Sequence, residues 1–198
     1  MGLPLMEAFY TVQGEGYHQG RAAYFVRLAG CDVGCVWCDV KESWDPAAHK
    51  TSTVAAIVEG AVASGAHLAV ITGGEPLMYD LGALTKALKN AGFKIHLETS
   101  GAHPLSGTWD WICLSPKKFS PPLQEILEKA DELKIIVYNK SDFRWGELYR
   151  SKVRPGCRLY LQPEWSRDEQ VMPDMVDYVK DHPDWQISLQ IHKFMNVP

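Results

Sequence analysis

The sequence predicts an α/β fold, with a mostly parallel β-sheet and helical crossovers, in one domain that spans residues 1–198. Two observations lead to this prediction. From residue 53 onward, short apolar strands alternate with segments of helical periodicity, as expected where parallel strands are joined by helices. The strands are also short and apolar, which fits burial on both faces better than an antiparallel sandwich does. No linker of low complexity and no internal repeat divides the chain.

Two strands and one helix are expected before the alternation begins. The strands cover Leu5–Thr11 and Ala23–Leu28, and the glycine-rich stretch Gly14–Gly20 separates them. The helix covers Val54–Ser64, where an apolar stripe recurs at helical spacing. The threonine before this helix can cap it, and the glycine after it can end it.

The alternating part of the chain is expected to contain six strands and four helices. The strands are His67–Thr72, Phe93–Glu98, Trp111–Leu114, Leu133–Val137, Arg158–Leu161 and Gln186–Ile191. The helices are Leu81–Asn90, Pro121–Lys129, Asp142–Arg150 and Asp174–Asp181. Asp80 and Ser120 are expected to cap two of them, and Pro173 to lie near the start of the last.

Polar motifs directly follow several of these strands. They are Thr72-Gly-Gly-Glu75, Glu98-Thr-Ser-Gly101, Ser115-Pro-Lys117 and Gln162-Pro163. Ligands bind at the C-terminal ends of the strands in parallel α/β sheets. The position of the motifs and the fold class therefore agree, and both predict one site at this edge of the sheet.

Composition and charge exclude several classes of protein. Hydrophobic residues make up 46% of the chain and charged residues 22%, as in ordinary globular proteins. No apolar run is long enough for a membrane span, and the first ten residues do not resemble a secretory signal, so we expect a cytoplasmic protein with no membrane partner. The net charge of −4 comes with no block of lysine or arginine, so we expect no direct contact with nucleic acid.

Three of the five cysteines, Cys31, Cys35 and Cys38, fall within eight residues and indicate a metal centre. Three thiolates on one loop can bind three irons of a [4Fe–4S] cluster and leave the fourth iron open to a small molecule. A structural zinc site is the alternative, and it would need a fourth ligand such as His49. The other two cysteines, Cys113 and Cys157, are expected to be ordinary buried residues because their surroundings are apolar.

The C-x-x-x-C-x-x-C spacing, with the aromatic Trp37 before the last cysteine, resembles the signature of radical S-adenosylmethionine (SAM) enzymes. The resemblance implies a partial (β/α) barrel in which a [4Fe–4S] cluster binds SAM and cleaves it to a 5′-deoxyadenosyl radical. Gly73-Gly74-Glu75-Pro76 is similar to the motif that contacts the SAM ammonium. The residues that the resemblance assigns to SAM are Trp37, Asp39, Gly73, Gly74, Glu75, Glu98, Ser115, Lys117 and Gln162. A structural ion pair is the alternative role for Glu98.

The segment FYTVQGEGYHQGRAAYFVRLAGC narrows the resemblance to the 7-carboxy-7-deazaguanine synthase family of the queuosine pathway. The motifs GGEP, ETSG and SPK and the ending IHKFMNVP extend it over the whole chain. It implies that 6-carboxy-5,6,7,8-tetrahydropterin is converted to 7-carboxy-7-deazaguanine with ring contraction and loss of ammonia. The residues assigned to the substrate are Val12, Gln13, Gly14, Glu15, Arg27, Thr72, His192 and Pro198.

The types of these residues suit a pterin carboxylate. A carboxylate such as Glu15 can accept two neighbouring N–H groups of the pterin, and the planar fork of Arg27 suits the substrate carboxylate. Arg27 paired with a surface acid and His192 as a structural histidine are the alternatives. In the terms of the resemblance, residues 1–30 form a substrate-binding segment, 31–41 the cluster loop, 53–191 the βα core and 192–198 a C-terminal tail.

Val40 departs from the pattern of the family, which usually has Ser or Thr there to help bind a magnesium ion. Valine offers no oxygen to a hard cation, so magnesium is a doubtful cofactor, and we assign no metal ligand beyond the cluster. The resemblance further implies a flavodoxin-like electron donor and a homodimer. Two rival functions stay open: a radical SAM activase that acts on a partner protein, and a zinc-stabilised binding module without catalysis.

Overall fold

The computed structural model describes residues 2–198, within which nine strands form one sheet in the order β3-β1-β2-β4-β5-β6-β7-β8-β9. The strands are β1 (Gly2–Val12), β2 (Ala22–Leu28), β3 (Thr51–Thr53), β4 (Leu68–Gly73), β5 (Lys94–Thr99), β6 (Trp111–Leu114), β7 (Glu132–Val137), β8 (Arg158–Pro163) and β9 (Trp185–Ile187). The helices are α1 (Val54–Ser64), α2 (Gly82–Asn90), α3 (Gln124–Lys129), α4 (Ser141–Arg150), α5 (Asp168–Asp181) and α6 (Ile191–Met195).

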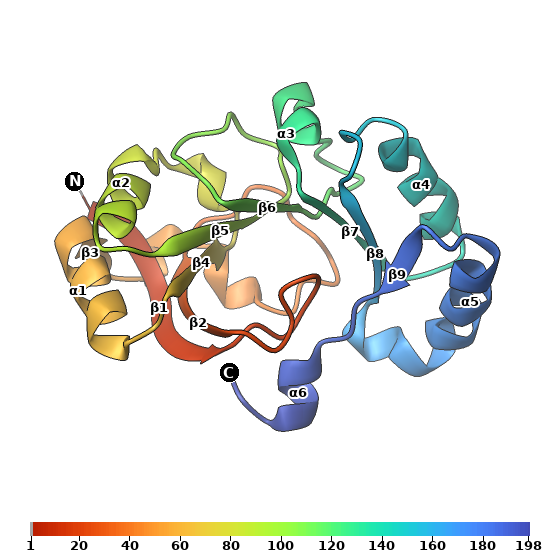
Figure 1. Cartoon of the computed structure of the whole chain (residues 1–198), viewed down its shortest axis with the longest axis horizontal. Coiled ribbons are helices and arrows are strands. Elements are labelled where there is room, and N and C mark those ends of the chain that lie inside the picture. Colours follow the sequence, from red (N-terminus) through yellow and green to blue (C-terminus); the bar gives the residue numbers. More distant parts are fainter. Residues whose placement is uncertain (1) are drawn as a thin grey trace.

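The sheet is mostly parallel, as the alternation of strands and helices predicts. From β2 through β4 to β9, every pair of neighbouring strands is parallel, whereas β1 runs antiparallel to both β2 and β3. Figure 1 shows the sheet curving around a central space, with α1 to α5 on its outside and α6 near the C-terminus beside the loop that joins β1 and β2. The architecture is therefore an open, partial (β/α) barrel.

The core lies between the outer face of the sheet and the helices. On α1, Ile57 and Ala61 lie one turn apart and are buried, which is the packing that the apolar stripe predicts. Thr53 accepts a hydrogen bond from the amide of Ala56 and caps this helix, and Gly65 ends it in the left-handed conformation, at φ 72°. No helix within residues 2–198 is long and apolar enough to cross a membrane.

Two helices begin later in the chain than the sequence predicts. In α2 the first helical residue is Gly82; Asp80 lies two residues before it and accepts a hydrogen bond from the amide of Gly82. In α3 the first helical residue is Gln124, so the prediction that Ser120 caps a helix beginning at Pro121 is wrong. Ser120 instead pairs with Lys117 in an isolated antiparallel bridge and donates its amide to the carbonyl of Lys117 over 3.3 Å, so this segment forms a tight turn before the two prolines.

The C-terminal third differs most from the prediction. Helix α5 begins at Asp168, six residues earlier than expected, and contains Pro173 in its interior. Val171 and Met175 lie one turn apart on its buried face, so packing against β8 and β9 outweighs the hydrogen bond that the proline cannot donate. The last strand ends at Ile187, and the residues after it form α6 instead of continuing the strand to Ile191. The short strand β3 was not predicted.

The side chain of Ser188 explains why the last strand ends early. Its hydroxyl donates to Oε1 of Gln162 over 2.9 Å and accepts the amide of Gly16 over 2.9 Å. The amide of Ile191 then donates to the carbonyl of Gly14 over 3.0 Å. These contacts direct the chain from the edge of the sheet across the open side of the barrel, so α6 packs against the β1–β2 loop.

Candidate active site

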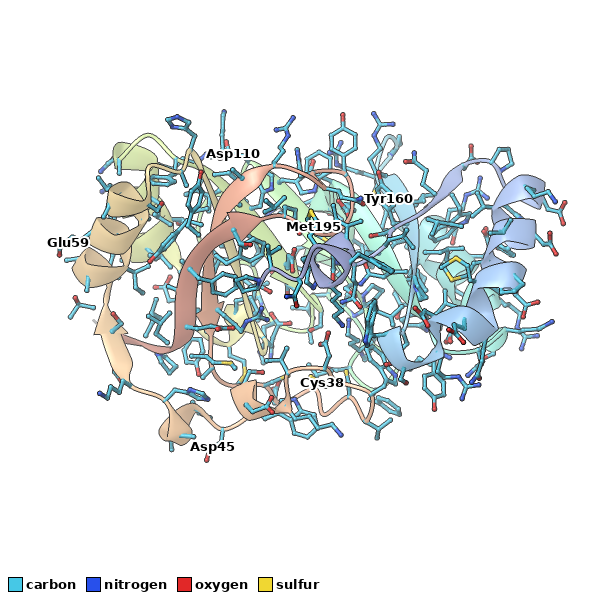
Figure 2. All side chains as sticks on the ribbon, turned by 90° about the horizontal axis from the view of Figure 1, so that it is seen from below. Cys38, Asp45, Glu59, Asp110, Tyr160 and Met195 are labelled. Atoms are coloured by element: carbon cyan, nitrogen blue, oxygen red, sulfur yellow. The ribbon has the colours of Figure 1, made fainter. Side chains whose placement is uncertain are left out.

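A cavity of about 420 Å³ lies at the C-terminal ends of the parallel strands, on the inner side of the sheet. Every residue that the sequence assigns to the cluster, SAM or substrate lines this cavity, with the exception of Glu75. Figure 2 shows Cys38, from the loop after β2, and Asp110, which precedes β6, on opposite sides of the molecule. Because they line one cavity, the residues that the sequence predicts for the site gather at one edge of the sheet, on the side of Cys38.

Backbone hydrogen bonds fix the ends of the cysteine loop. The amide of Cys31 donates to the carbonyl of Trp44 over 3.3 Å, and the amide of Cys38 donates to the carbonyl of Cys35 over 3.0 Å. Asp32, the residue after the first cysteine, lies 3.0 Å from Nε2 of His103, in the segment that follows β5. The loop is therefore attached to the segment after β5 as well as to its own ends.

The donor set fits an iron–sulfur cluster better than a single zinc ion. Cys31, Cys35 and Cys38 all line the cavity. A [4Fe–4S] cluster binds each cysteine through a different iron and can be held by these three thiolates, whereas a structural zinc ion needs a fourth ligand. His49, the possible fourth zinc ligand, does not line the cavity; its Nε2 donates to the carbonyl of Glu42 over 2.7 Å.

Burial controls the charge of the cysteine loop. It raises the pKa of both Cys31 and Cys35, and the ammonium of Lys117 partly offsets this effect at Cys35. Metal binding must therefore displace protons from these thiols. Lys117 donates to the carbonyl of Ser115 over 2.6 Å, and its Nζ lies 5.7 Å from the centre of the Trp37 ring. These residues form one wall of the cavity beside the cysteines.

Gly73 and Gly74 allow β4 to end against the start of the cysteine loop. A Cβ on Gly73 would lie 2.0 Å from the carbonyl oxygen of Leu28, and one on Gly74 would lie 2.2 Å from that of Gly30. Larger residues would push these backbones apart. The amide of Glu75 donates to the carbonyl of Gly30 over 2.8 Å and completes the junction. The double glycine therefore brings the end of a strand next to the first cysteine.

Glu75 does not line the cavity, because its carboxylate is buried and is occupied by hydrogen bonds within the protein. The residue is 1% exposed, and its carboxylate accepts the amide of Leu77 over 3.0 Å and the hydroxyl of Thr99 over 2.6 Å. It also accepts the amide of Ser100 over 2.8 Å, as well as the Ser100 hydroxyl. The bonds from Thr99 and Ser100 join the segment after β4 to the end of β5, whereas the bond from Leu77 caps the 3-10 turn at Pro76–Met78.

Three of the predicted polar residues form a connected group on the floor of the cavity. Nε2 of Gln13 donates to Oε1 of Glu98 over 2.9 Å, and Oγ1 of Thr72 donates to Oε2 over 3.2 Å. Within residues 2–198, Glu98 has no ion-pair partner, so the alternative of a structural ion pair is not what the structure shows. Oε1 of Gln13 accepts the amide of Glu15 over 3.1 Å, which extends the group to the next residue of the loop.

Glu15 lies deep in the cavity between two partners from the second half of the chain. Its carboxylate pairs with the ammonium of Lys134, on β7, and accepts a hydrogen bond from Nε2 of Gln190 over 2.8 Å. Burial by itself would raise the pKa of Glu15. The charge of Lys134 and the hydrogen bonds from Lys134 and Gln190 outweigh it and lower the pKa to about 2. Glu15 is therefore an ionised acceptor throughout the neutral range.

Arg27 lies at the cavity wall and also has a partner at the surface. Its Nε donates to Oε1 of Glu7 over 2.7 Å, while its guanidinium carbon lies 6.0 Å from the centre of the Phe9 ring. The alternative that Arg27 pairs with a surface acid is thus what the structure shows, but the pairing uses Nε alone. The terminal nitrogens have no hydrogen-bond partner among residues 2–198, and the side chain still lines the cavity.

The C-terminal residues complete the cavity. His192 lies in α6 and not at the end of a strand, and its ring packs so closely over Gly14 that a Cβ there would meet Nδ1 at 2.1 Å. Burial lowers the pKa of His192, and the nearby charge of Glu15 partly opposes this. A carbonyl oxygen of Pro198 accepts the hydroxyl of Thr11 over 3.0 Å, and Lys193 lies 3.5 Å from the carboxylate of Asp39. The tail is therefore attached to both β1 and the cysteine loop.

Sequence reasoning missed Lys134 and Gln190. A signal for Lys134 exists, because one lysine stands inside the apolar strand at residues 133–137, and a charged residue in a strand buried on both faces needs a partner. No local pattern marks Gln190. The expectation that Cys113 is buried is correct, whereas Cys157 is only half-buried.

Comparison with known proteins assigns the class first. The family model of the radical SAM superfamily matches residues 26–137, which include the cysteine loop and the ends of β4 and β5. The fold, the three cysteines and this match together define a radical SAM protein.

Similarity to individual proteins extends over nearly the whole chain. The 7-carboxy-7-deazaguanine synthase of Flavobacterium psychrophilum is 55% identical over 99% of this chain and 93% of its own length. The synthase of Synechocystis is 48% identical over 98% of this chain and 93% of its own, and that of Escherichia coli K12 is 34% identical over the full length of both. A crystal structure of QueE from Escherichia coli superposes with a TM-score of 0.84, at 30% identity, over 96% of this chain and 94% of that chain. The chain belongs to the 7-carboxy-7-deazaguanine synthase family of the radical SAM superfamily.

Proposed function

We propose that this protein converts 6-carboxy-5,6,7,8-tetrahydropterin to 7-carboxy-7-deazaguanine, with ring contraction and loss of ammonia, as a step of 7-deazapurine synthesis. The observation that carries the proposal is the acceptor group on the cavity floor. Two carboxylates, Glu15 and Glu98, lie with Gln13 in the same cavity as the three cysteines. A ligand that presents several N–H donors matches this floor, and the amino-pyrimidine edge of a pterin does so.

The other side of the proposed substrate matches the cavity wall. The carboxylate at C6 needs a cation, and Arg27 has two terminal nitrogens without a hydrogen-bond partner among residues 2–198. A guanidinium binds a carboxylate through two parallel hydrogen bonds, which would set the direction of C6 in the cavity. With Glu15 at one end and Arg27 at the other, the pterin would have one orientation.

A cluster held by Cys31, Cys35 and Cys38, together with SAM, would supply the radical chemistry that removes hydrogen from C6. The residues of this chain would bind SAM and the pterin and exclude water from the cavity. Ser115, Lys117 and the backbone of Gly73 and Gly74 would form the wall that receives SAM, with Trp37, Asp39 and Gln162 beside them. The acceptor group would hold the pterin still, and α6 would cover it and exclude water.

The finer assignments rest on the family resemblance. We infer a flavodoxin-like electron donor, a homodimer and a cytoplasmic location. Magnesium is the exception, because Val40 lines the cavity where a hydroxyl is usual in the family. Valine cannot ligate a hard cation, so we infer weak dependence on magnesium or none.

The test is anaerobic reconstitution with iron and sulfide, followed by incubation with SAM, a reductant and 6-carboxytetrahydropterin. We expect mass spectrometry to show a product lighter than the pterin by one ammonia. A variant with Ala at Cys31, Cys35 and Cys38 is the control and should form no product. If 5′-deoxyadenosine appears while the pterin is unchanged, the substrate assignment is wrong; if no cluster assembles, the radical chemistry is wrong as well.

A further inference from the structure

Lys134 is a buried cation in the interior of the barrel, and the function proposed above gives it no task. It lies on β7 between Leu133 and Ile135, which are both fully buried, and its own side chain is 5% exposed. Burying an ammonium group is unfavourable unless charged partners surround it. A lysine at this position therefore requires a reason beyond the packing of the strand.

The contacts of Lys134 give that reason. Its ammonium pairs with Oε2 of Glu15, from the loop between β1 and β2, which is 119 residues away in sequence. The negative charges of Glu15, Glu98 and Glu132 raise the pKa of Lys134 well above its usual value, against the effect of burial. Lys134 therefore stays protonated, and the carboxylate of Glu15 stays attached to β7.

A second contact fixes the rotation of the Glu15 carboxylate. Nε2 of Gln190 donates to Oε1 over 2.8 Å, so each oxygen of Glu15 has a partner from a different part of the chain. Each carboxylate oxygen has two lone pairs, so one acceptor position on each oxygen remains for a ligand. Both oxygens of Glu15 therefore keep acceptor capacity, and a carboxylate with two such oxygens can accept two neighbouring N–H groups.

We propose that Lys134 is a positioning residue for the pterin: it holds the Glu15 carboxylate in the orientation and charge state that accept the two N–H groups of the substrate. The inference rests on the proposed function, because it deepens the role of the same cavity. Lys134 acts through Glu15 and does not itself contact the substrate. Without Lys134, burial would raise the pKa of Glu15 and favour a neutral carboxyl, which accepts hydrogen bonds poorly.

The test uses three variants of the cluster-loaded protein: Glu15→Gln, Lys134→Met and the double variant. The dissociation constant of 6-carboxytetrahydropterin is measured anaerobically with SAM but without reductant, so that no turnover occurs. We expect Glu15→Gln to weaken binding about 100-fold and Lys134→Met about 10-fold or more. The double variant should bind within about threefold of Glu15→Gln alone, because two residues that act through one contact are not additive.

The pH dependence of the dissociation constant shows whether Lys134 positions Glu15 or only stabilises the fold. The titratable and charged groups around Glu15 are Lys134, His192, Glu98, Glu132 and Cys113. In the unsubstituted protein Glu15 stays ionised between pH 8 and 6, so any pH dependence of binding comes from other groups. In Lys134→Met, binding should weaken additionally as the pH falls, because burial raises the pKa of Glu15 once the charge of Lys134 no longer opposes it. Lys180→Met is the matched control: the side chain of Lys180 is 70% exposed on α5, so this variant should change neither the dissociation constant nor its pH dependence.

Three outcomes would overturn the inference. Additive losses in the double variant would mean that Lys134 contacts the substrate by itself, and unchanged binding by Lys134→Met would mean that Glu15 needs no partner. If Lys134→Met does not fold, Lys134→Gln takes its place in the comparison, because it removes the charge but keeps a hydrogen-bond donor for Glu15, and the same outcomes apply to it. If the unsubstituted protein does not bind the pterin, the proposed function fails and this inference fails with it. If it binds the pterin and the variants give either of the first two outcomes, only the inference fails, so the two failures are distinguishable.

Discussion

The side-chain amide of Gln13 donates to Oε1 of Glu98 over 2.9 Å, and this hydrogen bond joins the loop after β1 to the end of β5. Thr72, at the end of β4, donates to the other oxygen of the same carboxylate over 3.2 Å. Glu98 therefore connects three segments that lie far apart in sequence. These bonds hold the Glu98 carboxylate from both sides, so the floor of the cavity is preorganised and less conformational entropy is lost when a ligand binds there.

Glu75 is expected to stabilise the fold more than it binds SAM. Its buried carboxylate accepts hydrogen bonds from Leu77, Thr99 and Ser100, and a glutamine would turn an N–H group towards one of these donors. We expect Glu75→Gln to lower the free energy of unfolding by about 2–3 kcal/mol, measured by urea unfolding. The exposed Glu59→Gln on α1 is the control and should change it by less than about 0.5 kcal/mol. Normal stability with strongly weakened SAM binding would instead place this carboxylate on SAM.

Arg27 is expected to recognise the substrate carboxylate through its planar fork. Lysine keeps the charge but cannot form two parallel hydrogen bonds, so Arg27→Lys should lower kcat/KM for 6-carboxytetrahydropterin about 10- to 100-fold. Tetrahydropterin without the carboxylate should bind equally well to the protein and to the variant. Arg144→Lys, at an exposed position of α4, is the control. An equal loss of affinity for both ligands would show that Arg27 acts on the fold and not on the carboxylate.

Magnesium should have little effect on turnover, because Val40 lacks an oxygen. After treatment with a chelator and removal of divalent ions, we expect the rate of product formation to stay within about twofold of the untreated enzyme. Val40→Thr should introduce stimulation by magnesium, whereas Val62→Thr, on the exposed side of α1, should not. A rate that collapses without divalent ions and returns only with magnesium would contradict the prediction and would point to Asp39 as a ligand.

Glu15 is expected to make stability depend on pH in the acid range. Its pKa is about 2 in the folded protein and 4.5 as the reference value, so its stabilising contribution is complete above pH 4.5 and is lost as the pH falls towards 2. At about 1.4 kcal/mol for each tenfold change in proton affinity, the contribution is roughly 3 kcal/mol. Urea unfolding of the cluster-free protein between pH 6 and 3 measures it. Glu15→Gln should be less stable at pH 6 and should show a flatter decline; an equally steep decline would assign the effect to other carboxylates.

Local patterns in the sequence predict most of the fold. The cap at Thr53, the left-handed glycine after α1 and the short apolar strands lie where short-range interactions put them, because each depends on neighbours within a few residues. The exceptions are in places where distant packing decides. Pro173 lies inside α5 because the buried face of that helix packs on β8 and β9. His192 lies in a helix because the contacts of Ser188 end the last strand early.

By itself, the sequence determined the cysteine loop, the order of strands and helices, and the motifs at the strand ends. Each of these depends only on residues that are close together in the sequence. The tertiary structure decided which side chains meet. Only closure of the curved sheet brings Lys134 to Glu15, and only the path of α6 brings Gln190 to the same carboxylate. The tertiary structure also decided the direction of the Glu75 side chain, through hydrogen bonds from Thr99 and Ser100 at the end of β5. Contacts between residues more than a hundred positions apart leave no periodic signal, because their partners are selected by the geometry of the sheet and by the energetic need to pair buried charges.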